Sequence, residues 1–190
     1  MNIGIIDCGG ANLNSIYYSF KRININAFIT NSITELKNMD AYVLPGVGSA
    51  GIVMNKLKEK NLINLIKEST KPTLGICIGM QILFDHSEED NTECLGVIKG
   101  NVKKFKSDND IKVPQMGWNK VIADKSSLNG YYYFANSYYT DNDSYSIGHS
   151  YYGKKINSIV KKNNFLGCQF HPEKSSDIGE KFLKNFINII

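Results

Sequence analysis

Residues 72–81 read Pro-Thr-Leu-Gly-Ile-Cys-Ile-Gly-Met-Gln, an apolar run that leads directly into a cysteine between two glycines. The pattern predicts a buried strand over Pro72–Ile76 and a helix from about Ile78 to His86. A nucleophile between two glycines at a strand-to-helix junction is the cysteine form of a nucleophile elbow. Such a turn is sharp and needs small neighbours, and it presents the Cys77 thiol above the sheet, at the N-terminus of the helix.

Cys77 is therefore the candidate nucleophile, and the backbone N–H of Ile78 is placed to donate to an oxyanion. The alternative is a buried structural cysteine that happens to lie between glycines. A cysteine nucleophile needs a base and a group that orients this base, so the histidines are the next residues to examine.

His171 is the histidine that fits the role of the base. It follows an apolar strand, and strand C-termini gather at one edge of an open parallel sheet, so His171 can meet Cys77 there. Glu173, two residues further on, is able to hold the imidazole in its working tautomer. We interpret His86 as a surface residue at a charged helix end and His149 as a packing residue in a Ser/Tyr-rich strand.

A second glycine-rich strand end, Pro45-Gly46-Val47-Gly48, adds to this pattern. Glycines let the backbone approach a ligand closely or turn an N–H toward it. Together with the elbow, Val47 and Gly48 are candidates for the second oxyanion donor, although such strand ends are also common as plain turns.

Strands and helices alternate around these motifs. We expect strands over Ile3–Asp7, Asn26–Thr30, Ala41–Pro45 and Asn164–Phe170, and helices over Asn12–Arg22, Ile52–Glu68 and Ile178–Ile190. The region after Glu88 is rich in Tyr, Asn, Ser and Gly, which predicts antiparallel or mixed strands such as Gly130–Phe134 and Ser144–Gly148. The sequence thus predicts an α/β fold, a mostly parallel open sheet with helices on both faces and a smaller mixed strand region.

Length and composition fit one globular domain over residues 1–190. The chain has 22 basic and 18 acidic residues and a net charge of +4, and Arg22 is its one arginine. Sequence-specific DNA readers and phosphate clamps depend on arginine, so we expect no nucleic-acid partner. We also find no Walker-type loop and no GxGxxG motif, so chemistry on a phosphorylated acceptor is expected to lie on another chain.

The remaining signals concern location and metals. No apolar run reaches the length of a membrane span and no basic leader precedes the first strand, so we expect no membrane association. Four cysteines without CxxC pairing or His-rich spacing (Cys8, Cys77, Cys94, Cys168) fit a reducing cytoplasm and predict no metal and no cofactor.

Taken together, the elbow, the His-Pro-Glu segment and PGVG resemble the class I (triad) glutamine amidotransferases. More narrowly, the chain is similar to the glutaminase subunits of imidazole glycerol phosphate synthase. Further segments carry this likeness over essentially the whole chain: Asn12 after the first strand, 114–119 (PQMGWN), 131–138 (YYYFANSY) and 169–175 (QFHPEKS).

The resemblance implies a chemistry. Cys77 attacks the side-chain amide carbon of glutamine, His171 held by Glu173 manages the protons, and a γ-glutamyl thioester forms before water releases glutamate. The substrate glutamine is implied to contact Gly46, Gln81, Asn136, Ser137 and Tyr138. Ammonia then passes to a (βα)8-barrel synthase subunit, docked near Asn12, Met116, Trp118 and Asn119, which forms imidazole glycerol phosphate and AICAR in histidine biosynthesis.

Two positions depart from the family pattern, because Gln115 and Asn136 stand where histidine is usual. Neither belongs to the triad, but both leave open a second reading, in which the same glutaminase serves another synthase, for example one that aminates or amidinates a bacterial surface sugar. A third reading covers a γ-glutamyl hydrolase, a peptidase of similar fold or an idle partner-binding subunit. Glu173 and the intact triad argue against this third reading.

Overall fold

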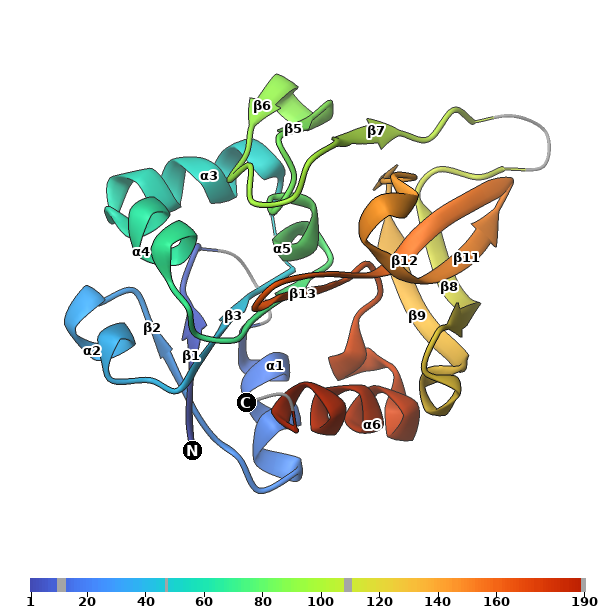
Figure 1. Ribbon diagram of the computed structural model, residues 1–190. Coiled ribbons are helices and arrows are strands. Elements are labelled where there is room, and N and C mark those ends of the chain that lie inside the picture. The colour runs from blue at the N-terminus through green and yellow to red at the C-terminus, as the bar shows by residue number, and fades with distance from the viewer. Residues whose placement is uncertain (10–12, 47, 108–110, 189–190) are drawn as a thin grey trace.

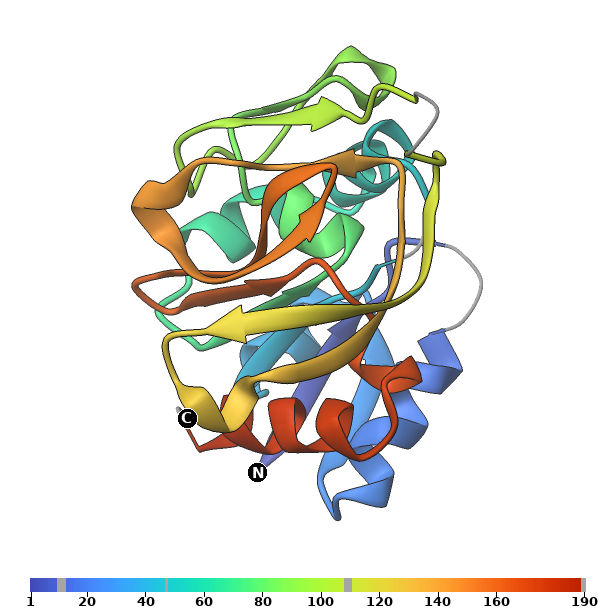
Figure 2. The ribbon, with the colours of Figure 1, turned by 90° about the vertical axis from the view of Figure 1, so that its right-hand side faces the viewer.

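The computed structural model describes residues 1–9, 13–46, 48–107 and 111–188. Its main feature is a nine-stranded sheet with the order β2-β1-β3-β4-β13-β12-β11-β8-β9 (Figures 1 and 2). The strands are β1 (Asn2–Ile6), β2 (Asn26–Thr30), β3 (Ala41–Leu44), β4 (Thr73–Ile76), β8 (Gln115–Ala123), β9 (Gly130–Asn136), β11 (Ser146–Tyr152), β12 (Lys154–Lys162) and β13 (Phe165–Cys168).

The sheet has a parallel half and an antiparallel half. In the first half, from β2 through β1, β3 and β4 to β13, neighbouring strands are parallel. In the second half, from β13 through β12, β11 and β8 to β9, neighbouring strands are antiparallel. The α/β fold class is confirmed, and the antiparallel region expected after Glu88 continues the main sheet. Because β4 and β13 are parallel neighbours with Ile76 opposite Cys168, the residues that follow both strands leave the same edge.

A second, four-stranded sheet has the order β10-β7-β5-β6. Its strands are β5 (His86–Ser87), β6 (Thr92–Glu93), β7 (Asn101–Lys104) and β10 (Tyr138–Tyr139). It is mixed, since β5 and β7 are parallel whereas the other two pairs are antiparallel.

Helices cover both faces of the main sheet (Figure 1). Helices α1 (Leu13–Arg22) and α6 (Ser176–Ile187) lie on one face, and α3 (Ala50–Glu59), α4 (Leu62–Glu68) and α5 (Ile78–Gln81) lie on the other. Helix α2 (Ile33–Lys37) follows β2, and short 3-10 turns occupy 89–91, 126–128, 143–145 and 172–174.

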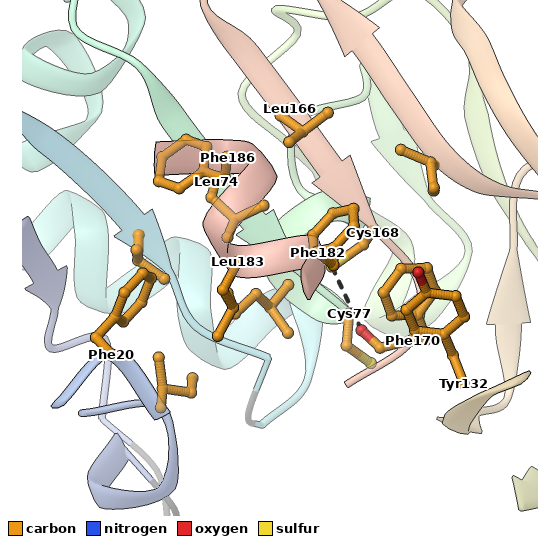
Figure 3. Close-up of a cluster of buried hydrophobic side chains, with 14 of the residues drawn as sticks. Phe20, Leu74, Cys77, Tyr132, Leu166, Cys168, Phe170, Phe182, Leu183 and Phe186 are labelled. Atoms are coloured by element: carbon orange, nitrogen blue, oxygen red, sulfur yellow. Dashed lines mark hydrogen bonds between the residues drawn. The ribbon is translucent and has the colours of Figure 1, made fainter. Parts of the chain in front are cut away.

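Two apolar cores correspond to these two faces. Phe20 of α1 and Phe182 of α6 pack in one core, and Leu57 of α3 and Leu62 of α4 pack in the other. Figure 3 shows the first core, where Cys77 lies at the edge of a group that includes Phe170 and Tyr132. The nucleophile candidate is therefore part of this core.

The structure differs from the sequence prediction in three places. The helix expected over Ile52–Glu68 is two helices, α3 and α4, because Asn61 adopts a left-handed conformation with φ of 56° between them. The helix expected from Ile78 to His86 ends at Gln81, since the backbone N–H groups of Leu95, Gly96 and Ile98 bond to the carbonyls that would continue it. Strand β12 and helix α2 were not predicted.

Within the described ranges, no helix combines the length and the apolar character that a membrane span requires.

Candidate active site

Cys77 stands at a strained turn between β4 and α5. Its φ and ψ are 50° and −108°, a conformation that L-residues rarely adopt. The turn is held by its backbone N–H, which donates to the Cys168 carbonyl at 2.7 Å, and the residue is 7% exposed. The side chain is thus fixed at the edge where β4 and β13 end.

Glycines make this turn sterically possible. A Cβ on Gly75 would lie 2.5 Å from the Gly79 carbonyl oxygen, and one on Gly79 would collide with the Leu44 carbonyl. A Cβ on Gly46 would lie 2.8 Å from Cys77 Cβ, so the segment after β3 touches the nucleophile directly. The expectation that the elbow needs small neighbours agrees with these close approaches.

His171 and Glu173 form a buried pair beside Cys77. His171 Nδ1 and Glu173 Oε1 are 2.8 Å apart, with side chains 6% and 2% exposed. Burial by itself lowers the pKa of His171, but the charge and hydrogen bond of Cys77 and then those of Glu173 outweigh this and raise it to about 10. The imidazole therefore lies between a sulfur and a carboxylate that both favour its protonated form.

The turn that carries His171 is tied to β9 by Ser175. The Ser175 hydroxyl donates to the His171 carbonyl at 2.6 Å and accepts from the Tyr133 N–H at 3.0 Å, and the His171 N–H donates to the Tyr133 carbonyl. Ser175 is fully buried. Sequence reasoning missed this role, which depends on a tertiary contact between α6 and β9.

A chain of buried amides reaches the sulfur from the other side. Gln169 Nε2 donates to Cys77 Sγ at 3.6 Å, and Gln169 Oε1 accepts from Gln81 Nε2 at 2.9 Å. Gln81 also donates to the Tyr138 carbonyl at 3.0 Å. The structure therefore links Gln81 and Tyr138 to the nucleophile through Gln169. The position of Gln169, two residues before His171, was the available signal.

Asn136 and Ser137 lie on the same segment as Tyr138. Asn136 Nδ2 donates to the Tyr138 carbonyl at 2.9 Å, and the adjacent Ala135 carbonyl oxygen is 3.8 Å from Cys77 Sγ. Ser137 is half-buried and its carbonyl accepts from the Phe105 N–H. The end of β9 is consequently one wall of the site.

A half-buried carboxylate acts on this wall. Burial and then the charge of Glu89, more than those of Asp90 and Glu88, raise the pKa of Tyr138. Burial also raises the pKa of Glu89, which accepts from the Ala50 N–H at 2.8 Å. Sequence reasoning missed Glu89, because it lies in an acidic run that is typical of a solvated turn.

The oxyanion candidates are only partly located. Ile78 begins α5 directly after Cys77 and is 5% exposed, and Gly48 has φ of 92°, a conformation that favours glycine. Val47 lies outside the described residues. Gly46 and Ile78 thus flank the nucleophile.

The partner candidates lie on an exposed apolar face of the antiparallel half-sheet. Met116 and Trp118 of β8 are 67% and 55% exposed, and Asn119 Nδ2 donates to the Tyr151 carbonyl. Asn12 lies outside the described residues. We call this surface the docking face; it comprises the exposed side chains of Met116, Trp118, Ile122, Tyr131 and Tyr151.

The other histidines have partners of their own. His86 is half-buried in β5, not at a helix end as expected, and its Nε2 lies 3.0 Å from Asn91 Oδ1. His149 packs edge-on against Tyr151. Across the described ranges, no group of three or more His, Cys, Asp or Glu residues is arranged to hold a metal ion.

The arrangement supports acyl transfer. A cysteine sulfur at a strained elbow, an imidazole beside it and a carboxylate that orients the imidazole together form the constellation that nucleophilic catalysis requires.

Comparisons with known proteins agree with this chemistry. The sequence model of the family described as "Glutamine amidotransferase class-I" matches residues 4–189. The chain is 43% identical to "Imidazole glycerol phosphate synthase subunit HisH 2" of Campylobacter jejuni, and the match covers 100% of both chains. It is 40% identical to "Imidazole glycerol phosphate synthase subunit HisH" of Haemophilus influenzae over 98% of this chain and 97% of that protein.

Solved structures share the fold at much lower identity. One described as "Crystal structure of glutamine amidotransferase" has a TM-score of 0.79 at 16% identity and covers 98% of this chain and 97% of its own. "Structure of PurLQS from Thermotoga maritima" has a TM-score of 0.72 at 17% identity, with 99% and 98% covered.

Proposed function

The chain belongs to the class-I glutamine amidotransferases and, within them, to the HisH subunits of imidazole glycerol phosphate synthase, and we propose how its residues carry out this activity. It is the glutaminase subunit, which hydrolyses glutamine and supplies ammonia for the formation of imidazole glycerol phosphate in histidine biosynthesis. We also propose that residues 1–190 form one amidotransferase domain and that the protein works in the cytoplasm.

The buried arrangement of Cys77, His171 and Glu173 is the observation that carries the mechanism. The Cys77 sulfur attacks the amide carbon of glutamine, and the protonated His171 gives its proton to the leaving nitrogen, so that the C–N bond breaks and ammonia departs. His171 then takes a proton from water, which attacks the thioester and releases glutamate and the sulfur. Glu173 keeps Nδ1 protonated throughout, because it accepts from that atom at 2.8 Å.

The charge that develops on the carbonyl oxygen needs donors. Ile78 and the backbone of the PGVG segment, including Val47 and Gly48, are proposed to supply them. This assignment is supported by Gly46, whose missing side chain lets the segment approach Cys77.

Glutamine itself is proposed to bind along the end of β9. The side chains of Gln81 and Asn136 both donate to the Tyr138 carbonyl, and Ser137 is the residue between Asn136 and Tyr138. Gly46 lies against Cys77 and is proposed to close the opposite side of the glutamine site. Glutamine also carries an α-ammonium group. We propose that Glu89, whose charge raises the pKa of Tyr138, attracts this group to the site.

The family name implies a partner subunit, and we propose a (βα)8-barrel synthase docked on the docking face. Exposed aromatic and sulfur-containing side chains on one face of a sheet are typical of protein interfaces. Met116 and Trp118 belong to this face, and Asn12 and Asn119 are proposed to extend it.

A different acceptor, such as a surface sugar, is not favoured, because the full-length relatives reported above are HisH subunits. The structure adds that Gln115 and Asn136 are 3% and 4% exposed, so neither side chain belongs to the docking face.

The test is Cys77→Ser, assayed for glutamate release in the presence of the synthase subunit. A serine fits the turn but lacks a readily formed anion, so the rate should fall by several orders of magnitude, about 10³-fold or more. Cys94→Ala is the matched control, because burial raises the pKa of Cys94 to about 12 and the residue lies outside the site. A Cys77→Ser protein that keeps about a tenth of the rate would exclude Cys77 as the nucleophile.

A further inference from the structure

Ser175 is a fully buried serine that joins the His171 turn, residues 171–175, to β9. Its Oγ donates to the His171 carbonyl at 2.6 Å and accepts from the Tyr133 N–H at 3.0 Å. A hydroxyl carries a single proton, so this proton is committed to the His171 carbonyl and a lone pair to the Tyr133 N–H. The side chain of Ser175 therefore links two stretches of backbone.

The hydroxyl stands where a direct backbone bond could otherwise lie. Opposite residues of two antiparallel strands can exchange both of their N–H···O bonds. His171 and Tyr133 form the first such bond, from the His171 N–H to the Tyr133 carbonyl at 2.9 Å. The second runs through Ser175, because the Tyr133 N–H donates to Oγ and Oγ donates to the His171 carbonyl. Ser175 thus sets the distance between the His171 carbonyl and β9.

The backbone of His171 sets the direction of its imidazole. His171 has φ of −100° and ψ of 97°, directly before the 3-10 turn Pro172–Lys174. Since ψ places the carbonyl relative to the side chain, a bond that fixes the carbonyl also fixes the direction in which the side chain leaves. The Lys174 N–H also donates to this carbonyl, at 3.1 Å, but it belongs to the turn itself and does not tie the turn to β9. Glu173, whose Oε1 is 2.8 Å from His171 Nδ1, lies in the segment that Ser175 closes.

The turn needs such a tie, because it leads into a strained residue. Ser176 has φ of 50°, a left-handed conformation that a residue with a side chain adopts at a cost in free energy. A Cβ on Gly179 would collide with the Pro172 carbonyl, so the first turn of α6 lies directly against the same segment. Strained conformations persist where the surrounding contacts hold them, and the two bonds of Ser175 are contacts of this kind.

We propose that Ser175 is a positioning residue for the proton transfers of His171, because its hydroxyl holds the His171 turn where the imidazole lies between Cys77 and Glu173. The inference rests on the proposed function, in which His171 gives a proton to the leaving nitrogen and takes one from water. Loss of the hydroxyl leaves the Tyr133 N–H without its acceptor and releases the His171 carbonyl from β9. Proton transfer depends on exact placement of the acid and base, so the loss should affect the chemical step and not glutamine binding.

The test is Ser175→Ala, assayed for glutamate release in the complex with the synthase subunit and its acceptor ligand. The kcat should fall about ten- to a hundredfold, the equivalent of losing one or two hydrogen bonds, while KM stays within about threefold of the native value. A second measurement follows the alkylation of Cys77 by iodoacetamide at about pH 7, read from the mass of the peptide that contains Cys77. This rate should fall about two- to tenfold, because an imidazolium kept beside a cysteine favours its reactive thiolate form.

Ser150→Ala is the matched control. The Ser150 hydroxyl is also buried, donates to the Lys120 carbonyl at 2.7 Å and accepts from Ser158 Oγ at 2.7 Å, but it lies on β11, outside the active site. Its loss should lower the free energy of unfolding in urea denaturation, as the loss of the Ser175 hydroxyl does, and should leave kcat and the alkylation rate unchanged.

Three results would overturn the proposal: an unchanged kcat in Ser175→Ala, an equal fall in Ser150→Ala, or a lower kcat with an unchanged alkylation rate. In the last case the imidazole would still lie beside the sulfur. Should Ser175→Ala not fold, Ser175→Cys, which is similar in size and a weaker donor, is measured against the same limits. A native complex that releases no glutamate would instead contradict the proposed function, and the alkylation rates would still test the position of His171.

Discussion

The pair of His171 and Glu173 makes the stability of the site depend on pH. In an unfolded chain the pKa of a histidine is about 6.5, whereas Cys77 and Glu173 overcome the opposing effect of burial and raise it to about 10 for His171. A raised pKa of a basic group means that its stabilising contribution is complete below pH 6.5 and is lost as the pH rises toward 10.

Glu173→Gln should therefore lower the free energy of unfolding most at about pH 6 and progressively less as the pH approaches 10. The variant removes one of the two groups that raise the pKa of His171 while leaving the hydrogen-bonding shape similar. The measurement is urea denaturation of both proteins at several pH values. Glu180→Gln, which removes an exposed ion pair with Arg22, is the control and should show little pH-dependent difference. A difference for Glu173→Gln that grows with pH would contradict the assignment.

Gln169 is a positioning residue for the nucleophile. It is fully buried, and it joins Cys77 Sγ to Gln81 through its two amide atoms. Hydrogen bonds to charged groups contribute about 1.5–3 kcal/mol, so Gln169→Leu should reduce kcat for glutamate release about ten- to a hundredfold.

A KM that stays within about threefold of the native value would separate this role from glutamine binding. Gln169→Met serves as a second variant of similar length. A rise in KM with an unchanged kcat would show that Gln169 contacts substrate and does not position the sulfur.

At the scale of elements, the elbow depends on close backbone contact between β3 and α5. A Cβ on Gly79 would collide with the Leu44 carbonyl, which belongs to the backbone and cannot move aside alone. Gly79→Ala should therefore destabilise the protein by more than about 3 kcal/mol in urea denaturation. Gly130→Ala is the control, because its Cβ would meet only the flexible side chain of Ile178. A loss for Gly79→Ala no larger than that for Gly130→Ala would show that the elbow tolerates side chains.

The same contacts explain what could be predicted from the sequence. Strands such as Asn26–Thr30 have clear apolar patterns and agree with the structure to the residue. The end of α5 could not be predicted, because the carbonyls after Gln81 bond to a segment near Leu95 that is remote in sequence. Strand β12 was missed since its lysines at both ends mask a buried centre around Asn157 and Ser158.

Site residues that belong to a short sequence motif could be predicted. Site residues that act through tertiary contacts could not. Cys77, His171 and Glu173 stand in such motifs, and the structure brings them together. Gln169 acts through contacts with Cys77 and Gln81, and Ser175 acts through a contact with β9. The residue types of both indicate no role by themselves. The sequence also does not show that Gln115 and Asn136 are cross-strand partners, because this depends on the register between β8 and β9.

At the scale of the whole molecule, the nucleophile lies between two surfaces that a partner could influence. On one side, the PGVG segment follows β3 and touches Cys77 through Gly46. On the other, Ala135 touches the sulfur, and its cross-strand partner Met116 is on the docking face. One cross-strand pair thus connects the proposed partner surface with the sulfur of Cys77.

We expect the isolated chain to be a poor glutaminase that its partner activates. An oxyanion hole needs donors aimed at the developing charge, and one misplaced donor costs about 10² to 10³ in rate. Gly48 has φ of 92°, a conformation that glycine adopts at little cost. Glycines on both sides of Val47 would allow a peptide unit of this segment to turn either way. A two-state element of this kind, biased both by glutamine and by the docked partner, is sufficient for coupling between the subunits.

The measurement is glutamate release at saturating glutamine by the chain alone, with the synthase subunit, and with the subunit and its acceptor ligand. The rate should rise about 10²-fold or more, the equivalent of one oxyanion donor. Trp118→Ala should require more synthase subunit for half-maximal activation, about tenfold or more, since a tryptophan that becomes buried on docking is a typical anchor of an interface. Phe28→Ala is the control, because Phe28 is 45% exposed on β2, at the opposite end of the sheet. A lone chain as fast as the liganded complex would exclude gating, because its oxyanion donors would then already be aligned without the partner.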